Sequence, residues 1–168
     1  MHWTMTVEER CQGWLSERWH RQFREILLHT LARHRLVCPI YCVMPDHLHL
    51  VWVGVEATSD QVLAARFFRR HTNELLAPRE WQRQAYDNVL GPNDRAEAAF
   101  QKVCGHILEN PVRAGLVADW ADYAFSGAMM PGFPTLSLRR DDYWMIFWQV
   151  YGETVNEEEK RSGKLPNT

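Results

Sequence analysis

Two histidines, His47 and His49, stand two residues apart in the run CVMPDHLHLVW, which spans residues 42–52. Side chains of an extended strand alternate between its two faces, so both imidazoles project from one face and Leu48 projects from the other. Their Cα atoms then lie roughly 6.5–7 Å apart, which is close enough for both rings to bind one metal ion. The spacing therefore predicts one half of a metal site, and a second element must supply the rest.

The second half is expected on a helix over residues 95–113, whose apolar stripe between Phe100 and Leu108 should face the sheet. At 100° per residue, His106 and Asn110 lie one turn apart at the edge of that stripe. A polar side chain at such a boundary reaches toward the sheet without entering the core. We expect these two residues to converge with His47 and His49 on one cavity.

Each of these residues also has a purely structural interpretation. A His-x-His pair on a half-exposed strand usually has no function, and His106 can be a solvated edge residue. Asn110 precedes a proline and can serve only to satisfy backbone groups at a helix end. The arginines at i, i+3 and i+4 on an earlier helix are more often a solvated face than a phosphate clamp; these are Arg66, Arg69 and Arg70.

The elements that position these residues are predicted from periodicity and from start and stop signals. A short first strand is expected over residues 2–7, and a helix over residues 16–35. Two strands (39–44 and 47–53) share a tight Pro45-Asp46 turn. A second helix, capped by Thr58, Ser59 or Asp60, runs to about residue 76, and a strand is expected over residues 81–90 before the 95–113 helix. The order predicts an antiparallel sheet with helices packed on it, in the α+β class.

Composition bounds the class of protein. The chain has 168 residues, a hydrophobic fraction of 46% and eight tryptophans, which is typical of one globular core. No apolar stretch is long enough to cross a membrane, and no signal-peptide pattern is present, so we expect a cytoplasmic protein. The cysteines form no Cys-x-x-Cys pair and are expected to be reduced thiols. A net charge of −2 is unusual for a nucleic-acid protein, although arginines gather in the middle of the chain.

Several longer strings resemble the REP-associated tyrosine transposases, which belong to the single-tyrosine HUH transposases. They are YCVMPDHLHLVW at residues 41–52, WQRQAYD at 81–87, ILENPVRAGLV at 107–117 and DYAFS at 122–126. The resemblance implies a ferredoxin-like, HUH transposase-like domain over residues 1–128 with a short first strand. We expect an aromatic, partly helical extension over residues 129–152 and a polar tail over residues 153–168.

The resemblance also implies a function and a site. Such proteins cut and rejoin single-stranded DNA, whose ends they recognise as hairpins. His47, His49 and Asn110 would hold Mg²⁺ or Mn²⁺, which polarises the scissile phosphate. Arginines would contact the DNA; the expected ones are Arg66, Arg69, Arg70, Arg83 and Arg113. The protein could act as a monomer or as a homodimer.

One position departs from the family pattern. The nucleophilic tyrosine of the family stands four residues before the asparagine, and here that residue is His106. An imidazole gives a labile phosphoramidate, whereas a phenol gives a stable phosphodiester link. Tyr86 and Tyr123 are possible substitutes, but neither has the one-turn spacing. Three functions stay open: DNA nicking and rejoining, hairpin binding without catalysis, and metal-dependent hydrolysis of DNA by water.

Overall fold

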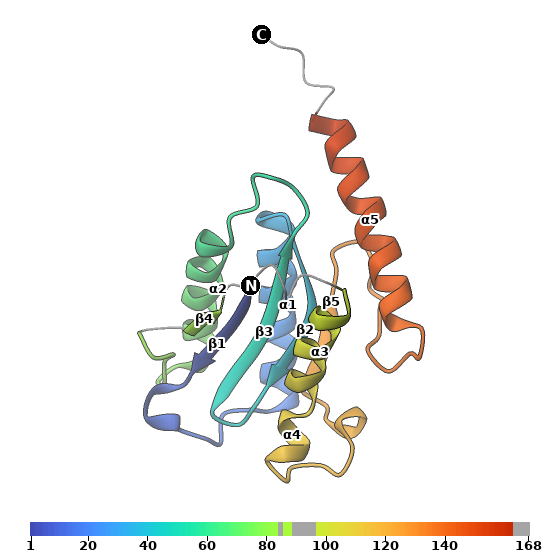
Figure 1. Cartoon of the computed structure of the whole chain (residues 1–168). Helices are drawn as coiled ribbons and strands as arrows, with labels where there is room; N and C mark the ends of the chain where they lie inside the picture. Colours follow the sequence, from blue (N-terminus) through green and yellow to red (C-terminus); the bar gives the residue numbers. More distant parts are fainter. Residues whose placement is uncertain (84–85, 89–96, 163–168) are drawn as a thin grey trace.

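The computed structural model describes residues 1–83, 86–88 and 97–162, and it contains a five-stranded antiparallel sheet (Figure 1). The strands lie in the order β4-β1-β3-β2-β5. Their bounds are β1 His2–Thr6, β2 Leu36–Val43, β3 His47–Gly54, β4 Tyr86–Asn88 and β5 Ser126–Met129. Apart from β5, the order and the antiparallel pairing are those of a ferredoxin-like β-α-β-β-α-β unit, which confirms the expected fold class.

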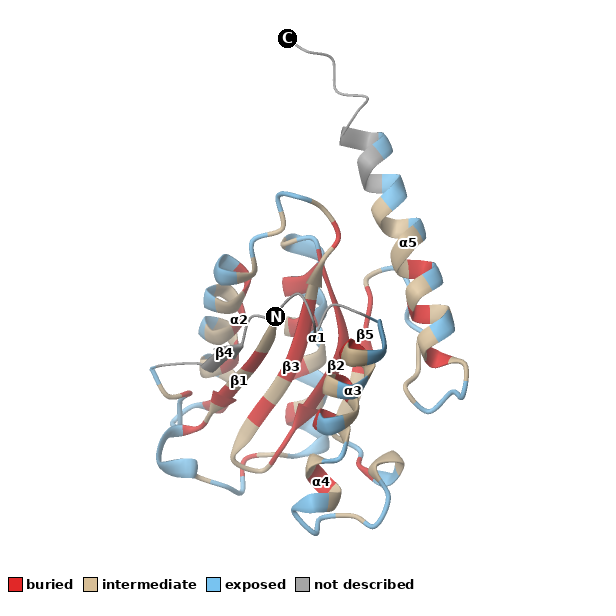
Figure 2. Cartoon of the chain, in the orientation of Figure 1, coloured by how far each residue is buried: buried red, intermediate tan, exposed pale blue. Residues whose placement is uncertain are grey.

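Two helices, α1 (Glu17–Arg33) and α2 (Gln61–Leu76), cover one face of this sheet. Both begin at a residue whose side chain caps the helix, and for α2 this is Asp60, one of the three predicted candidates. Ser16 accepts a hydrogen bond from the backbone N–H of Trp19, and Asp60 accepts two from the first turn of α2. Their apolar sides meet fully buried strand residues such as Leu48 and Leu50, and Figure 2 shows the outer sides of the helices exposed.

The opposite face is covered by α3 (Glu97–Leu108) and α5 (Tyr143–Ser162). Phe100, Cys104 and Ile107 of α3 pack on buried residues of β2 and β3, as the predicted apolar stripe requires. The hydroxyl of Tyr143 at the start of α5 donates to the Pro39 carbonyl at 2.5 Å. In Figure 1, α3 descends toward the end of the sheet where the chain turns from β2 to β3. That turn precedes the histidine pair.

The single helix expected over residues 95–113 is divided. It ends at Leu108, and a separate short helix, α4, runs over Asn110–Arg113 with Pro111 in its first turn. Proline lacks the N–H that would continue the α3 hydrogen-bond ladder, so the break falls at the Asn-Pro pair. Gly115, with φ +69°, comes after α4 as the expected stop.

Two of the expected segment boundaries fall inside secondary-structure elements. The boundary after residue 128 falls inside β5, which pairs with β2, and the boundary after residue 152 falls inside α5, which continues to Ser162. The weak strand SGAM forms because Gly127 lets β5 approach Tyr41: a Cβ at Gly127 would lie 2.7 Å from the Tyr41 hydroxyl. No helix of the described residues is long and apolar enough to cross a membrane.

Candidate metal centre

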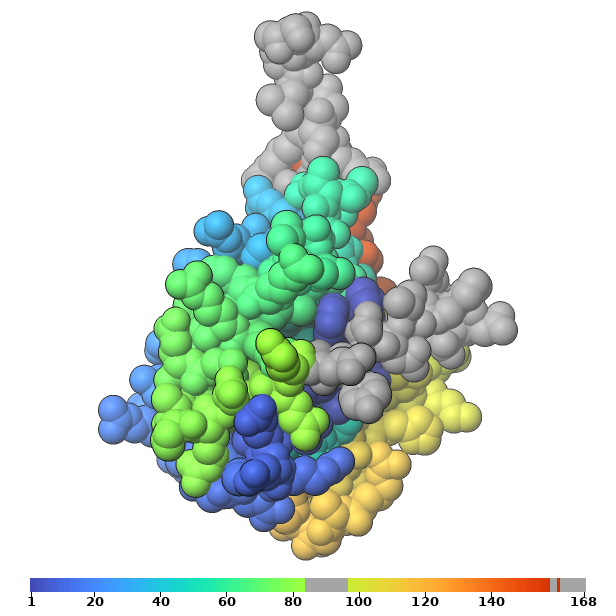
Figure 3. Space-filling model, turned by 90° about the vertical axis from the view of Figure 1, so that its left-hand side faces the viewer, coloured from blue at the N-terminus to red at the C-terminus, as the bar shows by residue number. Residues whose placement is uncertain are grey.

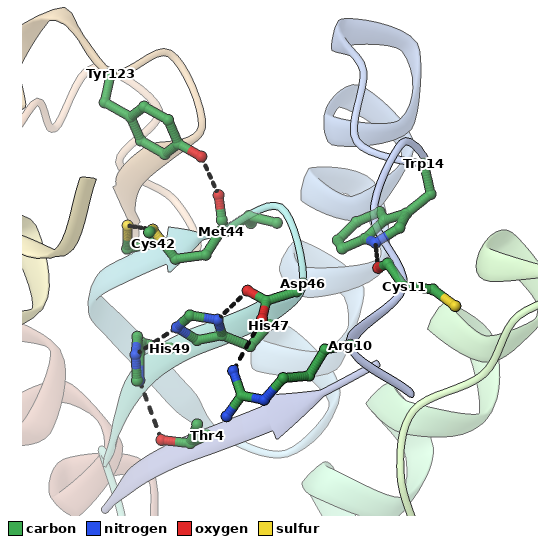
Figure 4. Close-up of polar contacts among 11 residues, drawn as sticks. Thr4, Arg10, Cys11, Trp14, Cys42, Met44, Asp46, His47, His49 and Tyr123 are labelled. Atoms are coloured by element: carbon green, nitrogen blue, oxygen red, sulfur yellow. Dashed lines mark hydrogen bonds and ion pairs between the residues drawn. The ribbon is translucent and has the colours of Figure 1, made fainter. Parts of the chain in front are cut away.

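His47 and His49 lie on the face of β3 that α3 covers, and their rings meet there (Figure 4). The Nε2 atoms of the two imidazoles are 3.1 Å apart, and the ring planes are almost perpendicular at 86°. Both side chains are only partly buried, whereas Leu48 between them is fully buried on the other face. The strand alternation expected from the sequence therefore holds at this pair.

The other ring nitrogen of His47, Nδ1, is bound by Asp46, the preceding residue in the turn between β2 and β3. His47 Nδ1 lies 2.6 Å from Asp46 Oδ1, and Arg10 donates to the second carboxylate oxygen at 2.9 Å. Burial alone would raise the pKa of Asp46, but the hydrogen bonds with His47 and Arg10 lower it below its usual range. An ionised carboxylate on Nδ1 orients the ring and leaves Nε2 facing His49.

His49 is oriented by two side chains of β1. Its Nδ1 lies 3.1 Å from Thr4 Oγ1 and 3.2 Å from His2 Nε2, because the strand register pairs Thr4 with His49. Burial lowers the pKa of His49 to about 3, and the nearby charges of His47, His2 and Arg113 add to this effect. His49 is consequently neutral near pH 7, the state in which an imidazole nitrogen can bind a metal.

The spacing of the two Nε2 atoms fits a shared cation. Metal–imidazole bonds are about 2.0–2.1 Å, so two such ligands at right angles lie about 3 Å apart. Within residues 1–83, 86–88 and 97–162, no group of three or more His, Cys, Asp or Glu residues is arranged to hold a metal. A cation at this pair would therefore take its further ligands from amide, phosphate or water oxygens.

His106 lies in the last turn of α3, and Asn110 begins α4. Arg113 contacts both residues. The guanidinium of Arg113 donates to Asn110 Oδ1 at 2.7 Å and to the His106 carbonyl at 2.9 Å. The Arg113 charge also contributes to the lowered pKa of His49, which places it near the pair. His106 is exposed, and in the described part of the chain no hydrogen bond joins His106 or Asn110 to either histidine. Their convergence with the pair stays a prediction.

The two alternative tyrosines differ in position. The Tyr123 hydroxyl is buried, donates to the Val43 carbonyl at 2.7 Å and points toward that carbonyl rather than toward the histidines (Figure 4). Burial, with the neighbouring Cys42 thiol, raises the pKa of Tyr123, which disfavours a nucleophilic phenolate. Tyr86 lies in β4, where the register pairs it with Thr4, the partner of His49; its side chain lies outside the described part.

The structure does not gather the five predicted DNA-binding arginines on one surface. Arg113 lies on the face of the histidine pair. Arg66, Arg69 and Arg83 line a cavity on the opposite face of the sheet, and Arg70 is exposed on α2. Helical spacing placed the α2 arginines together, but it carries no information on which side of the sheet the helix packs.

Sequence reasoning missed four residues that hold the pair: His2, Thr4, Arg10 and Asp46. Two of them had a usable signal. His2 and Thr4 alternate with the apolar Trp3 and Met5 along the first strand, as residues on a polar face do. Arg10 had no such signal. Its own backbone is left-handed, with φ 51°, and local sequence does not predict that its side chain contacts Asp46.

Comparison with known proteins gives a likeness among solved structures. No protein-family model and no curated protein matches the chain. Among solved structures, it is similar to a REP-associated tyrosine transposase bound to a REP hairpin, with a TM-score of 0.62 and 20% sequence identity. The match covers 74% of this chain and 73% of the other. The likeness is one of fold. This chain therefore has a transposase-like fold.

Proposed function

We propose that the protein binds single-stranded or hairpin DNA and cleaves it with a divalent cation held by His47 and His49. The observation that carries the proposal is the 3.1 Å approach of the two Nε2 atoms on one face of a transposase-like fold. Two imidazole nitrogens on one strand face, at a distance that two ligands of a single cation would have, support a shared metal ion there. The likeness to a hairpin-bound transposase supports DNA as the partner.

Each contact around the pair has a role in this proposal. When bound, Mn²⁺ or Mg²⁺ would act as a Lewis acid on the scissile phosphate. His47 and His49 would supply nitrogen ligands, and Asn110, whose amide oxygen now accepts from Arg113, would supply an oxygen ligand. Asp46 and Thr4 fix the two ring orientations through Nδ1. Arg113, which is exposed and also donates to the His106 carbonyl, would then be available for a DNA phosphate.

The residue at position 106 restricts the fate of a cleaved strand. An exposed histidine cannot form the stable phosphotyrosine link by which DNA strands are later rejoined, and the Tyr123 hydroxyl is held by Val43. Rejoining would therefore need Tyr86. Without it, water would be the nucleophile, and the exposed His106 would be the candidate general base.

A second candidate function is hairpin binding without cleavage. The contact of Arg113 with Asn110 Oδ1 favours it, because that oxygen is then engaged rather than available as a ligand. A protein that binds in this way would keep the histidine pair but would not need it for affinity.

The test is incubation of the purified chain with a labelled DNA hairpin and Mn²⁺, and then separation of covalent adducts, free fragments and gel-shifted complexes. His47→Ala and His49→Ala should abolish cleavage. His29→Ala is the matched control, because His29 is exposed on α1 and lies outside the site. An adduct lost on Tyr86→Phe would establish tyrosine chemistry. Fragments without an adduct indicate hydrolysis, and a gel shift without any cleavage by the wild type would establish the binding function instead.

A further inference from the structure

A polar cavity of about 190 Å³ lies at the β5 edge of the sheet. It is lined by β5 itself, by Arg24 of α1 and by parts of the chain segments before and after β5, at residues 120–121 and 136–139. The strands β5 and β4 are the two edges of the sheet. Figure 3 looks onto the other edge, where α2 and the segment after it (green) lie beside N-terminal residues (blue). The proposed cation site uses none of the residues that line this cavity.

The guanidinium of Arg24 is oriented from inside the fold. It donates to the Tyr41 hydroxyl at 2.5 Å, and that hydroxyl also lies 3.1 Å from His20 Nε2. Tyr41 is fully buried, and burial raises its pKa to about 12, so the hydroxyl is neutral and does not balance the charge of Arg24. Gly127 permits this arrangement, since a Cβ there would lie 2.7 Å from the hydroxyl. A half-buried cation with a fixed orientation thus lines the cavity.

A second guanidinium, that of Arg139, lines the cavity from the segment after β5. Its Nε donates to the Ala121 carbonyl at 2.8 Å, which uses one of its five N–H donors and holds the side chain in place. In the part of the chain that the structure describes, neither Arg24 nor Arg139 forms an ion pair. None of the described lining residues is acidic, and Ser126 and Ser137 add hydroxyl groups. The cavity therefore offers positive charge and hydrogen-bond donors without a carboxylate.

We propose that this cavity binds a phosphate group between Arg24 and Arg139. The planar guanidinium presents pairs of N–H donors whose spacing matches two oxygens of a phosphate. A partly buried charge without a counter-ion is costly, and a bound anion offsets that cost. The serine hydroxyls can donate to the remaining phosphate oxygens, which a carboxylate lacks. The volume is below that of sites for drug-sized ligands, so a small anionic group fits it better than a large ligand.

The phosphate can belong to a free phosphate ester or to a DNA strand, and the second source rests on the proposed function. The strand register pairs His49 with Cys42 and Cys42 with Ser126, so Ser126 lies level with His49 two strands away. Neighbouring strands are about 4.8 Å apart, which places the two backbones about 10 Å from each other. That distance corresponds to about three nucleotide steps of a stacked strand. One strand could therefore place one phosphate at the cation and another in this cavity.

The experiment titrates inorganic phosphate into the purified chain, without divalent metal and at constant ionic strength, and follows the backbone amide signals by NMR. In the wild type, the signals of residues 126–128 and 137–139 should shift together and saturate. Arg139→Gln, at an exposed position, should weaken phosphate binding about tenfold. Arg24→Lys keeps the charge but loses the planar pair of donors, so it should also weaken binding. Arg21→Gln is the matched control, because Arg21 is exposed on α1 and does not line the cavity.

A second arm distinguishes the two sources of the phosphate. Binding of a short oligothymidylate, again without metal, is measured by calorimetry for the wild type, Arg139→Gln and Arg21→Gln. If Arg139→Gln loses more strand affinity than Arg21→Gln, the cavity binds a phosphate of the DNA backbone. If the two variants bind the strand equally and only Arg139→Gln loses inorganic phosphate, the cavity is a site for a free phosphate ester.

The proposal is overturned if phosphate does not shift the signals of residues 126–128 and 137–139, or if folded Arg139→Gln binds phosphate as tightly as the wild type. The amide spectrum of each variant shows directly whether it is folded. Failure of the proposed function is distinguishable, because it would show as hairpin processing insensitive to His47→Ala, whereas the phosphate titration uses neither the cation nor the histidine pair.

Discussion

The two faces of the sheet use the same strands for opposite purposes. On the α1 and α2 face, Leu48, Leu50 and Trp52 of β3 are at most 1% exposed and pack into a dense aromatic core. On the other face, His47 and His49 of the same strand are only partly buried and contact polar groups. Residues one position apart along β3 thus belong to a core and to a candidate metal site. The strand period of two makes this possible without a loop.

This difference in burial between the two faces separates the residues that stabilise the fold from those proposed to bind metal and DNA. Removing a core side chain leaves a cavity, and the surrounding structure relaxes only partly. Removing a polar side chain from a half-open face lets water take its place at small cost. Mutations on the first face should therefore act on the free energy of unfolding, and mutations on the second on metal and DNA binding.

The largest effect is expected for Leu48→Ala, which should lower the free energy of unfolding by about 2–5 kcal/mol. His49→Gln, one residue further along, should lower it by no more than about 1 kcal/mol, since the ring is only partly buried. Urea unfolding monitored by circular dichroism measures both. Equal losses for the two variants would mean that the histidine face is as tightly packed as the core, and the comparison would fail.

Asp46→Asn tests the polar face. The amide cannot orient His47 as the ionised carboxylate does, so Mn²⁺ affinity should fall about 10- to 100-fold. Titration calorimetry with Mn²⁺ gives the dissociation constant, and the unfolding free energy should change little because the ion-pair partner Arg10 is 68% exposed. Asp60→Asn is the matched control: Asp60 caps α2 and should alter stability slightly but not Mn²⁺ affinity. Unchanged affinity in Asp46→Asn would show that the pair does not bind Mn²⁺ through an oriented His47.

Sequence reasoning predicted what depends on periodicity. The apolar and polar alternation of β3 gave the histidine pair, helical periodicity gave α1, and the candidate caps that included Asp60 gave the start of α2. The sequence pattern did not predict side-chain contacts that depend on which strands pair and in which register. Thr4 meets His49 only because β1 pairs with β3, and nothing local encodes that pairing.

The C-terminal third shows the same limit. Residues 153–162 are polar, yet α5 continues through them because Glu and Lys are good helix formers once the aromatic turns of α5 are packed. The strand β5 is short and contains a glycine, so its pattern is too weak to recognise; it forms because β2 offers an edge to pair with.

The pH dependence of stability gives a test on the core side. Burial, with the charge of Arg24, lowers the pKa of His20 to about 4, below its value of about 6.5 in the unfolded chain. Between these values the unfolded chain binds more protons, so the free energy of unfolding falls as the pH falls from about 6.5 toward 4. We expect a loss of about 1–2 kcal/mol from His20, allowing for solvent screening of a partly exposed ring.

The measurement compares urea unfolding at about pH 7 and about pH 4.5 for the wild type and for His20→Gln. The variant should have a shallower pH slope, whatever its absolute stability. His29→Gln, which replaces an exposed histidine on the same helix, should retain the wild-type slope. If His20→Gln leaves the slope unchanged, the pH dependence arises on the other face, where His49 also has a lowered pKa.

The smallest effect is expected for Arg113→Gln, and its sign discriminates between two arrangements of the polar face. The substitution removes a positive charge near His49 and releases Asn110 Oδ1. Mn²⁺ affinity should then rise a few-fold, and more at low salt than at high salt. Arg70→Gln, on the opposite side of the sheet, should leave it unchanged. A fall in affinity would instead show that Arg113 holds Asn110 in the orientation in which its amide oxygen reaches the cation.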